Sequence, residues 1–159
     1  MIAARSAALL CAVVAAVPLA AQSSAPARHA TGQALHAQVA AMDRAMKPGQ
    51  GFAYQPLVEA DGQTAALEIW KAPGRPAVHP DDAEYVMVVD GAGEMISGGS
   101  LVDAKTTRAD LIEGSRIAGG TTQPLKTGDV FLVPAGVPHW FGIRGPRLVL
   151  LGTKIRTHR

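Results

Sequence analysis

The chain has 159 residues, of which 48% are hydrophobic and 18% charged, and its formal net charge is +2. This length fits one domain with a single substantial core, and we expect no second domain. The nearly balanced charge, with no basic cluster interleaved with aromatic residues, excludes the electrostatic kind of nucleic-acid binding. The partners that we expect are therefore small molecules and a second copy of the chain.

The first 21 residues have the layout of a secretory signal peptide. Arg5 precedes an apolar run over residues 6–17, and small residues follow before the polar Gln22. Because this run is short for a transmembrane helix, cleavage near Ala21 is the expectation, with an uncleaved membrane anchor as the alternative. The only cysteine, Cys11, lies in this leader, so the processed chain would contain no disulfide. We expect an exported protein, periplasmic or secreted, with no membrane attachment after processing.

One amphipathic helix is predicted near the start of the processed chain. Residues 22–32 are rich in serine, alanine and proline and have no hydrophobic period, which is typical of a flexible lead-in. Between Gln33 and Met46 apolar residues recur at steps of four, three and four, and the stripe ends before Pro48. Its members are Leu35, Val39, Met42 and Met46. We assign residues 33–50 to this N-terminal helix.

Residues 51–159 show an all-β pattern. Short β-prone runs are broken by glycine and proline at intervals of roughly eight to twelve residues, as in sandwiches and barrels. Strands are expected at residues 52–58, 64–71, 84–90, 94–97, 110–112, 130–133, 139–143 and 147–155. Glycine supplies the positive φ of tight turns, so residues 91–93 are expected to form a hairpin turn. The polar segment 100–118 is expected to be an irregular excursion with at most one short strand.

The run Tyr85 to Val89 is apolar on both faces, which indicates a strand that is covered on both sides. Either the N-terminal helix or a second subunit could cover the outer face. We expect a homodimer, because the helix offers only a narrow apolar stripe.

Two histidines and a glutamate are the candidate metal ligands. His79 and Glu84 flank a turn-forming segment, and His139 follows a turn that contains Pro134, Gly136 and Pro138. Imidazole nitrogen and carboxylate oxygen suit divalent iron, manganese, nickel, zinc or copper, and three such ligands leave coordination positions open for water or substrate. The alternative is that the histidines are hydrogen-bonded polar residues and that the glutamate is an exposed strand end.

The five-residue separation of His79 and Glu84 would place them on opposite faces of one continuous strand. Residues 80–83 are turn-forming, however, and a break there lets both side chains face the interior. The interior face would then also carry the candidate pocket-lining residues, which are Val86, Val88, Phe141 and Ile143. We expect an apolar pocket with a metal ion at one end.

The segment from Gly128 to His139 resembles the second conserved sequence element of the cupin superfamily. Gly128, five residues, Pro134, one residue, Gly136, two residues and His139 follow the family's pattern, except that Ile143 stands where the family has asparagine. This resemblance implies an all-β fold, a small double-stranded β-helix barrel of jelly-roll type. Within the superfamily the chain is similar to bacterial single-domain, type 2-like cupins.

The segment from His79 to Gly91 resembles the first sequence element of the same family. The matching features are Glu84, the six-residue run after it, and Gly91. His79 then takes the place of the family's second histidine, and Ala77 stands where the first would be. The resemblance therefore implies three metal ligands, His79, Glu84 and His139, instead of four. In an alternative register His79 is the first histidine and Asp81 becomes a further candidate ligand.

Two functions follow as expectations. The first is a metal-dependent enzyme of dioxygenase, isomerase or lyase type that acts on a small oxygen-bearing molecule. The second is a non-catalytic module that binds or senses a small ligand, which the missing histidine favours. The residues do not decide between them, because a fold does not fix a function.

Overall fold

The computed structural model describes residues 25–157, so the predicted signal peptide, residues 1–21, lies outside the described residues. Across residues 25–157 a single helix precedes eleven strands. The elements are α1 (Gly32–Ala45), β1 (Phe52–Ala60), β2 (Gln63–Trp70), β3 (Ala77–Val78), β4 (Asp82–Ser97), β5 (Ser100–Val102), β6 (Lys105–Arg108), β7 (Leu111–Glu113), β8 (Arg116–Ala118), β9 (Thr121–Lys126), β10 (Val130–Val133) and β11 (His139–Arg156). The expectation of an all-β fold with one N-terminal helix is confirmed.

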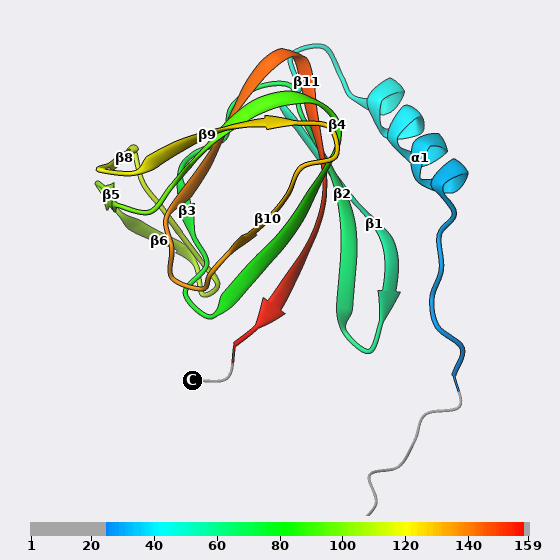
Figure 1. Cartoon of the computed structure of the whole chain (residues 1–159), viewed down its shortest axis with the longest axis horizontal. Coiled ribbons are helices and arrows are strands. Elements are labelled where there is room, and N and C mark those ends of the chain that lie inside the picture. The colour runs from blue at the N-terminus through cyan, green and yellow to red at the C-terminus, as the bar shows by residue number, and fades with distance from the viewer. Residues whose placement is uncertain (1–24, 158–159) are drawn as a thin grey trace, which may run out of the picture.

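The strands curl into a barrel around β4 and β11, which are the two longest. β4 pairs with β9, β10 and β11, and one path through the main sheet runs β1-β2-β11-β3-β7-β6. β5 and β8 form a separate pair that projects from the barrel on the side away from α1 (Figure 1). Long-range pairing of β4 with β11 therefore brings the two halves of the candidate site together.

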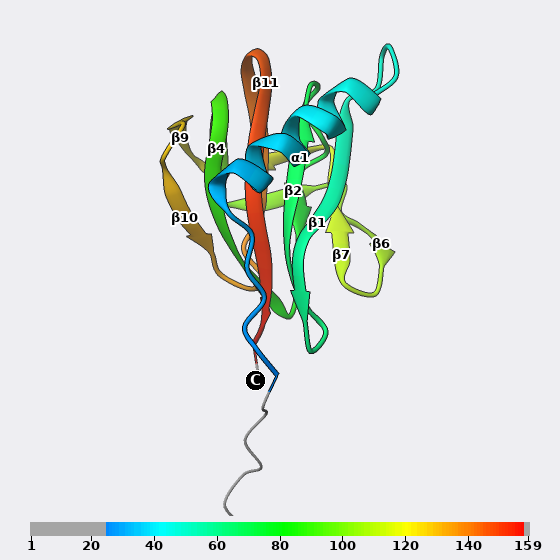
Figure 2. The ribbon, with the colours of Figure 1, turned by 90° about the vertical axis from the view of Figure 1, so that its right-hand side faces the viewer.

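α1 begins at a capped N-terminus, where the Thr31 hydroxyl oxygen accepts a hydrogen bond from the Ala34 amide at 3.1 Å. The helix lies across the outer face of β11, β2 and β1 (Figure 2). Its buried residues Val39 and Met42 pack there against Leu67, Ile69 and Val149. The predicted apolar stripe is thus the face that the helix buries.

A second core cluster fills the barrel interior, on the opposite side of β4 from the helix. Its buried members are Val86, Val88, Met95, Leu125, Val133, Phe141, Leu148 and Leu150. Val86 and Val88 belong to this inner cluster, whereas Val89 belongs to the cluster beneath α1. The helix therefore covers part of the outer face of β4, and the predicted homodimer stays a prediction.

Ion pairs fasten the helix to the barrel. Arg147 places one guanidinium nitrogen 2.6 Å from Asp43 of α1 and another 2.6 Å from Asp90 of β4. Lys71 lies 2.6 Å from the other oxygen of Asp43. Lys71 and Arg147 lower the pKa of Asp43 against the opposing effect of its burial.

The predicted hairpin turn at residues 91–93 is wrong. β4 runs without interruption from Asp82 to Ser97, and β11 pairs along its whole length. Gly91 does adopt a positive φ of 86°, but there the ladder shifts its register opposite the segment between Arg144 and Leu148. The extra residues at this shift are residues 145–147 of β11. The strands predicted at 84–90 and 94–97, and at 139–143 and 147–155, therefore merge into two long ones.

The prediction for residues 100–118 is also wrong, because this segment forms the four short strands β5 to β8. β6 is exposed at every position, so its sequence shows no alternation of buried and exposed residues. β7 pairs with β3 and so joins the main sheet beside His79. None of the described helices has the length and apolar character needed to cross a membrane.

Gly91 offers a test of this architecture. A Cβ at Gly91 would overlap the carbonyl oxygen of Arg147, whereas at Gly49, with a similar φ of 79°, it would meet nothing within 4 Å. We expect Gly49→Ala to lower the free energy of unfolding by about 1 kcal/mol and Gly91→Ala by more than about 3 kcal/mol. Urea unfolding measures both, and equal losses would contradict the close β4–β11 contact.

Candidate metal centre

Three separate parts of the chain bring His79, Glu84 and His139 together. His79 lies in the turn between β3 and β4, Glu84 is near the start of β4, and His139 is the first residue of β11. The amide of Gly136 donates to the carbonyl oxygen of His79 at 2.8 Å, so the turn before His139 is fastened to the turn that carries His79. The predicted break after His79 is present, and all three side chains are buried.

The three candidate ligand atoms lie within 4.8 Å of one another. Glu84 Oε2 is 3.1 Å from His139 Nε2 and 4.0 Å from His79 Nε2. Metal–nitrogen and metal–oxygen bonds are roughly 2.0–2.2 Å long, so two ligands of one ion stand up to about 4 Å apart. The two distances to the carboxylate oxygen are therefore compatible with a single bound ion.

Backbone carbonyls orient both imidazole rings. His79 Nδ1 lies 2.9 Å from the carbonyl oxygen of Asp110, and His139 Nδ1 lies 3.1 Å from that of Val137. A carbonyl oxygen can only accept, so each Nδ1 donates its proton and each Nε2 keeps a free lone pair. Lys154 Nζ is 3.3 Å from His79 Nδ1, farther away than the carbonyl. Both free Nε2 atoms consequently face Glu84, which is the arrangement that metal-binding histidines adopt.

Glu84 Oε2 is buried and accepts no hydrogen bond. A buried carboxylate oxygen without a donor is costly, and here its neighbours are two imidazole lone pairs. A cation between the three atoms would remove that cost. This donor set therefore fits a divalent transition ion, and no other group of three such side chains converges in this way within residues 25–157.

Burial and the charges of neighbouring side chains shift the pKa values of His79 and Glu84. Burial lowers the pKa of His79, which favours the neutral ring that a metal needs. Burial would raise the pKa of Glu84, but in the metal-free protein the protonated forms of His139 and His79, together with Lys154, outweigh it, so the pKa is lowered. The carboxylate is therefore ionised at neutral pH.

The three side chains open into a cavity of about 360 Å³. Its other lining residues are Phe52, Glu68, Trp70, Gly74, Arg75, Ala77, Leu111, Glu113, Trp140, Phe141 and Lys154. Ala77 pairs with His139 across β3 and β11 and lines the cavity, and its methyl group offers no ligand atom there. That side of the group is open to the cavity.

Of the other predicted site residues, only one lines the cavity. Phe141 lines the cavity as expected, whereas Val86, Val88 and Ile143 pack in the inner core cluster and are not among its lining residues. Asp81 is exposed and lies 3.5 Å from Arg156, away from the histidines, so the alternative register loses its support.

The expectation of an apolar pocket is too simple, because Glu68 and Lys154 also line it. The indole Nε1–H of Trp70 donates to Glu68 Oε2 at 2.9 Å. Burial, together with the charge of Glu84, raises the pKa of Glu68 to about 7. Its signal in the sequence was a carboxylate between the apolar residues Leu67 and Ile69, with Trp70 on its own face of β2.

A barrel that encloses two histidines and a carboxylate in this arrangement defines a class of protein, the small β-barrels with an interior site able to hold a metal. The chain belongs to the cupin family, because the model described as "Cupin" matches residues 71–156. A comparison with curated proteins found no match.

Solved structures support the same fold. A recombinant oxalate oxidase in complex with glycolate matches with a TM-score of 0.50 and 16% identity, over 74% of this chain and 58% of that one. The protein TT1209 from Thermus thermophilus also has a TM-score of 0.50, with 15% identity over 73% of this chain and 94% of that one. Another oxalate oxidase structure matches with a TM-score of 0.48 and 18% identity over 68% of this chain, and the chain spans only 52% of the length of that one. The two matches with a TM-score of 0.50 support the fold.

Proposed function

We propose that this cupin is exported and binds one divalent transition ion, iron, manganese, nickel, zinc or copper, through His79 Nε2, His139 Nε2 and Glu84 Oε2. The observation that carries the proposal is the buried Oε2 atom of Glu84, which accepts no hydrogen bond. It faces the Nε2 atoms of two imidazole rings, and the Nδ1–H group of each ring donates to a backbone carbonyl instead. A metal ion satisfies all three atoms at once.

The ion, when bound, would polarise an oxygen-bearing ligand or activate oxygen. Ala77 leaves room for such a ligand beside His139, and a cavity of about 360 Å³ fits a small molecule. The aromatic rings of Phe141 and Trp70 line the cavity. Glu68, with a pKa of about 7, can accept or donate a proton at neutral pH. These features favour a metal-dependent enzyme of dioxygenase, isomerase or lyase type.

A non-catalytic module that binds or senses a small ligand is the second candidate. Ala77 favours it, because the site then has three protein ligands where the family's pattern has four. Such a module would use the same ion and the same cavity to hold its ligand.

Substrate turnover distinguishes the two candidates. The iron-loaded protein is offered a panel of phenols and diketones, and both oxygen uptake and product formation are followed, so that reactions without oxygen are also detected. We expect turnover of at least one compound, and its loss in a His139→Ala variant treated in the same way. Silence across the panel, with the ion still bound, would favour the binding module.

Export and self-association complete the proposal. Export is supported by the apolar run at residues 6–17, and N-terminal sequencing of the protein from a cell fraction outside the cytoplasm should find a start near Gln22.

A homodimer is supported by Tyr85, Val130 and Leu132, which are exposed side by side on β4 and β10. Sedimentation of the processed chain tests the dimer, and a monomer at every concentration would contradict it.

A further inference from the structure

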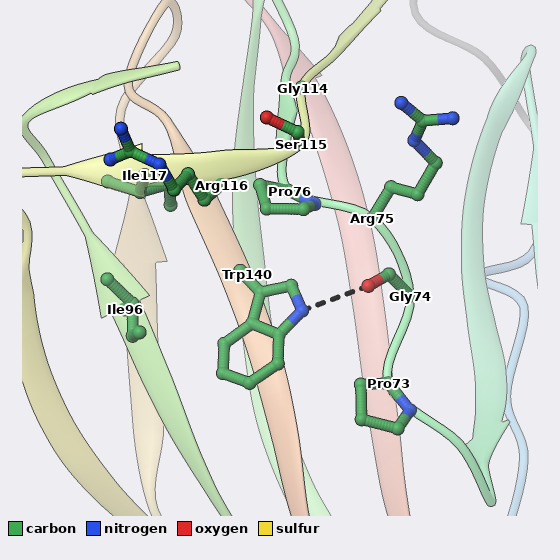
Figure 3. Close-up of a pocket in the computed structure, with 10 residues that line it drawn as sticks. All are labelled: Pro73, Gly74, Arg75, Pro76, Ile96, Gly114, Ser115, Arg116, Ile117 and Trp140. Carbon is green, nitrogen blue, oxygen red and sulfur yellow. Dashed lines mark hydrogen bonds between the residues drawn. The ribbon is translucent and has the colours of Figure 1, made fainter. Parts of the chain in front are cut away.

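A second cavity, of about 570 Å³, lies outside the group of His79, Glu84 and His139 and has no role in the proposed function. It is a groove between the segment before β3 and the strand β8 (Figure 3). Its lining residues are Pro73, Gly74, Arg75, Pro76, Ile96, Gly114, Ser115, Arg116, Ile117 and Trp140. We refer to this set as the Trp140 groove.

The walls of the Trp140 groove are apolar and one of them is aromatic. The indole Nε1–H of Trp140 donates to the carbonyl oxygen of Gly74 at 2.9 Å, which fixes the ring against the segment before β3 (Figure 3). Ile96, Ile117 and Pro76 provide further apolar surface. A fixed indole beside aliphatic side chains offers a flat surface on which an aromatic or unsaturated molecule can stack.

The charges at the groove are all positive. Arg75 and Arg116 are its only charged lining residues, and no acidic side chain lines it. Figure 3 shows the two guanidinium groups directed to opposite sides, with the Trp140 ring below them in this view. Because both side chains are exposed, they are free to turn toward a bound molecule.

The same two arginines stand apart from the other arginines of the barrel. Four of the six within residues 51–157 form ion pairs with carboxylates, and they are Arg108, Arg144, Arg147 and Arg156. Arg75 and Arg116 form none with any residue that the structure describes. The two arginines of residues 51–157 that form no ion pair therefore both line the Trp140 groove, which has no acidic lining residue.

We propose that the Trp140 groove is a binding site for a small organic anion with a flat apolar body, such as an aromatic carboxylate. The body would stack on Trp140, and the carboxylate would accept hydrogen bonds from Arg75 or Arg116, whose planar guanidinium matches it. An uncharged molecule of the same shape would gain only the apolar part of this interaction.

The groove adjoins the metal cavity without being part of it. Gly74, Arg75 and Trp140 line both cavities, whereas Trp70 lines only the metal cavity. Gly74 separates the two indoles, since a Cβ on it would lie 2.6 Å from the Trp70 ring. A molecule in the groove would therefore contact the wall of the metal cavity, although its binding requires no metal.

The two tryptophans of the chain provide a direct readout, because each gives its own indole N–H signal in a proton–nitrogen correlation NMR spectrum. Naphthoate is titrated into the metal-free protein, with uncharged naphthamide as the isosteric control, and a Trp70→Phe variant assigns the signals. We expect a saturable shift of the Trp140 signal and about tenfold weaker binding of naphthamide. Equal affinity for the two probes, a shift confined to Trp70, or no saturable shift would overturn the proposal.

Arginine variants test the source of the anion preference. Arg75→Gln and Arg116→Gln are each expected to weaken naphthoate binding, and the double variant to bind naphthoate no better than naphthamide. Arg44→Gln, at an exposed position of α1, is the matched control and should bind as the parent does. A double variant that still prefers naphthoate would contradict the site, whether or not the protein binds a metal.

Discussion

Replacing His139 by alanine should lower the affinity for divalent transition metals by at least about 100-fold and leave the barrel folded. The change removes one of three ligand atoms, and two remaining ligands hold an ion far less tightly. The barrel survives because His139 lies at the very start of β11, and the long pairing of β11 with β4 and β2 does not depend on its side chain. Calorimetric titration measures the affinity, and circular dichroism and thermal unfolding measure the fold.

The matched control for this variant is His36→Ala. His36 is exposed on α1 and belongs to no group of converging ligands, so its loss should leave the metal affinity unchanged. A His139→Ala protein that retains a full equivalent of metal at the parent affinity would defeat the ligand assignment.

Replacing Glu68 by glutamine should change how the stability of the metal-free protein depends on pH. Glu68 has its pKa raised from 4.5 to about 7, so the folded state holds a proton that the unfolded state has already released between these values. The stability that this proton confers is complete below about pH 4.5, falls as the pH rises to about 7, and is then lost. A shift of this size corresponds to at most about 3 kcal/mol.

Glutamine imitates the protonated carboxyl group and can still accept the hydrogen bond of Trp70. The Glu68→Gln protein should therefore be more stable than the parent above pH 7 and equal to it near pH 4. Urea unfolding at a series of pH values in the presence of a chelator measures the difference. Glu59→Gln, at an exposed position of β1, serves as control. Parallel pH curves for the parent and Glu68→Gln would show that Glu68 titrates normally.

The sequence predicted the group of His79, Glu84 and His139 because each residue is marked locally, by the turn after His79 and by the proline-rich turn before His139. Glu68 was missed because its environment comes from distant segments. Trp70 is its neighbour in β2, but Glu84 and Lys154 reach it only through the pairing of β2, β11 and β4. No local pattern encodes that proximity.

The fold was predicted in outline and missed where pairing overrides local preference. Glycine at 91 and 93 signals a turn, but neighbouring strands on both sides hold β4 extended, and the register shift opposite Gly91 comes from the extra residues 145–147 of β11. The strands β5 to β8 were missed because polar residues separate the short apolar pairs of this segment, and β6 in particular is exposed throughout. The Trp140 groove was missed for the same reason, since β8 supplies two of its residues, Arg116 and Ile117.

Elemental analysis of the chain from about Gln22 onward, purified without an affinity tag and without added metal, shows whether the barrel holds a metal ion. We expect about one equivalent of iron, manganese, nickel, zinc or copper per chain, and its loss in a Glu84→Ala variant that remains folded. A folded parent protein that carries no metal, and takes up none when offered each ion in turn, would contradict the metal centre and leave His79 and His139 as structural residues.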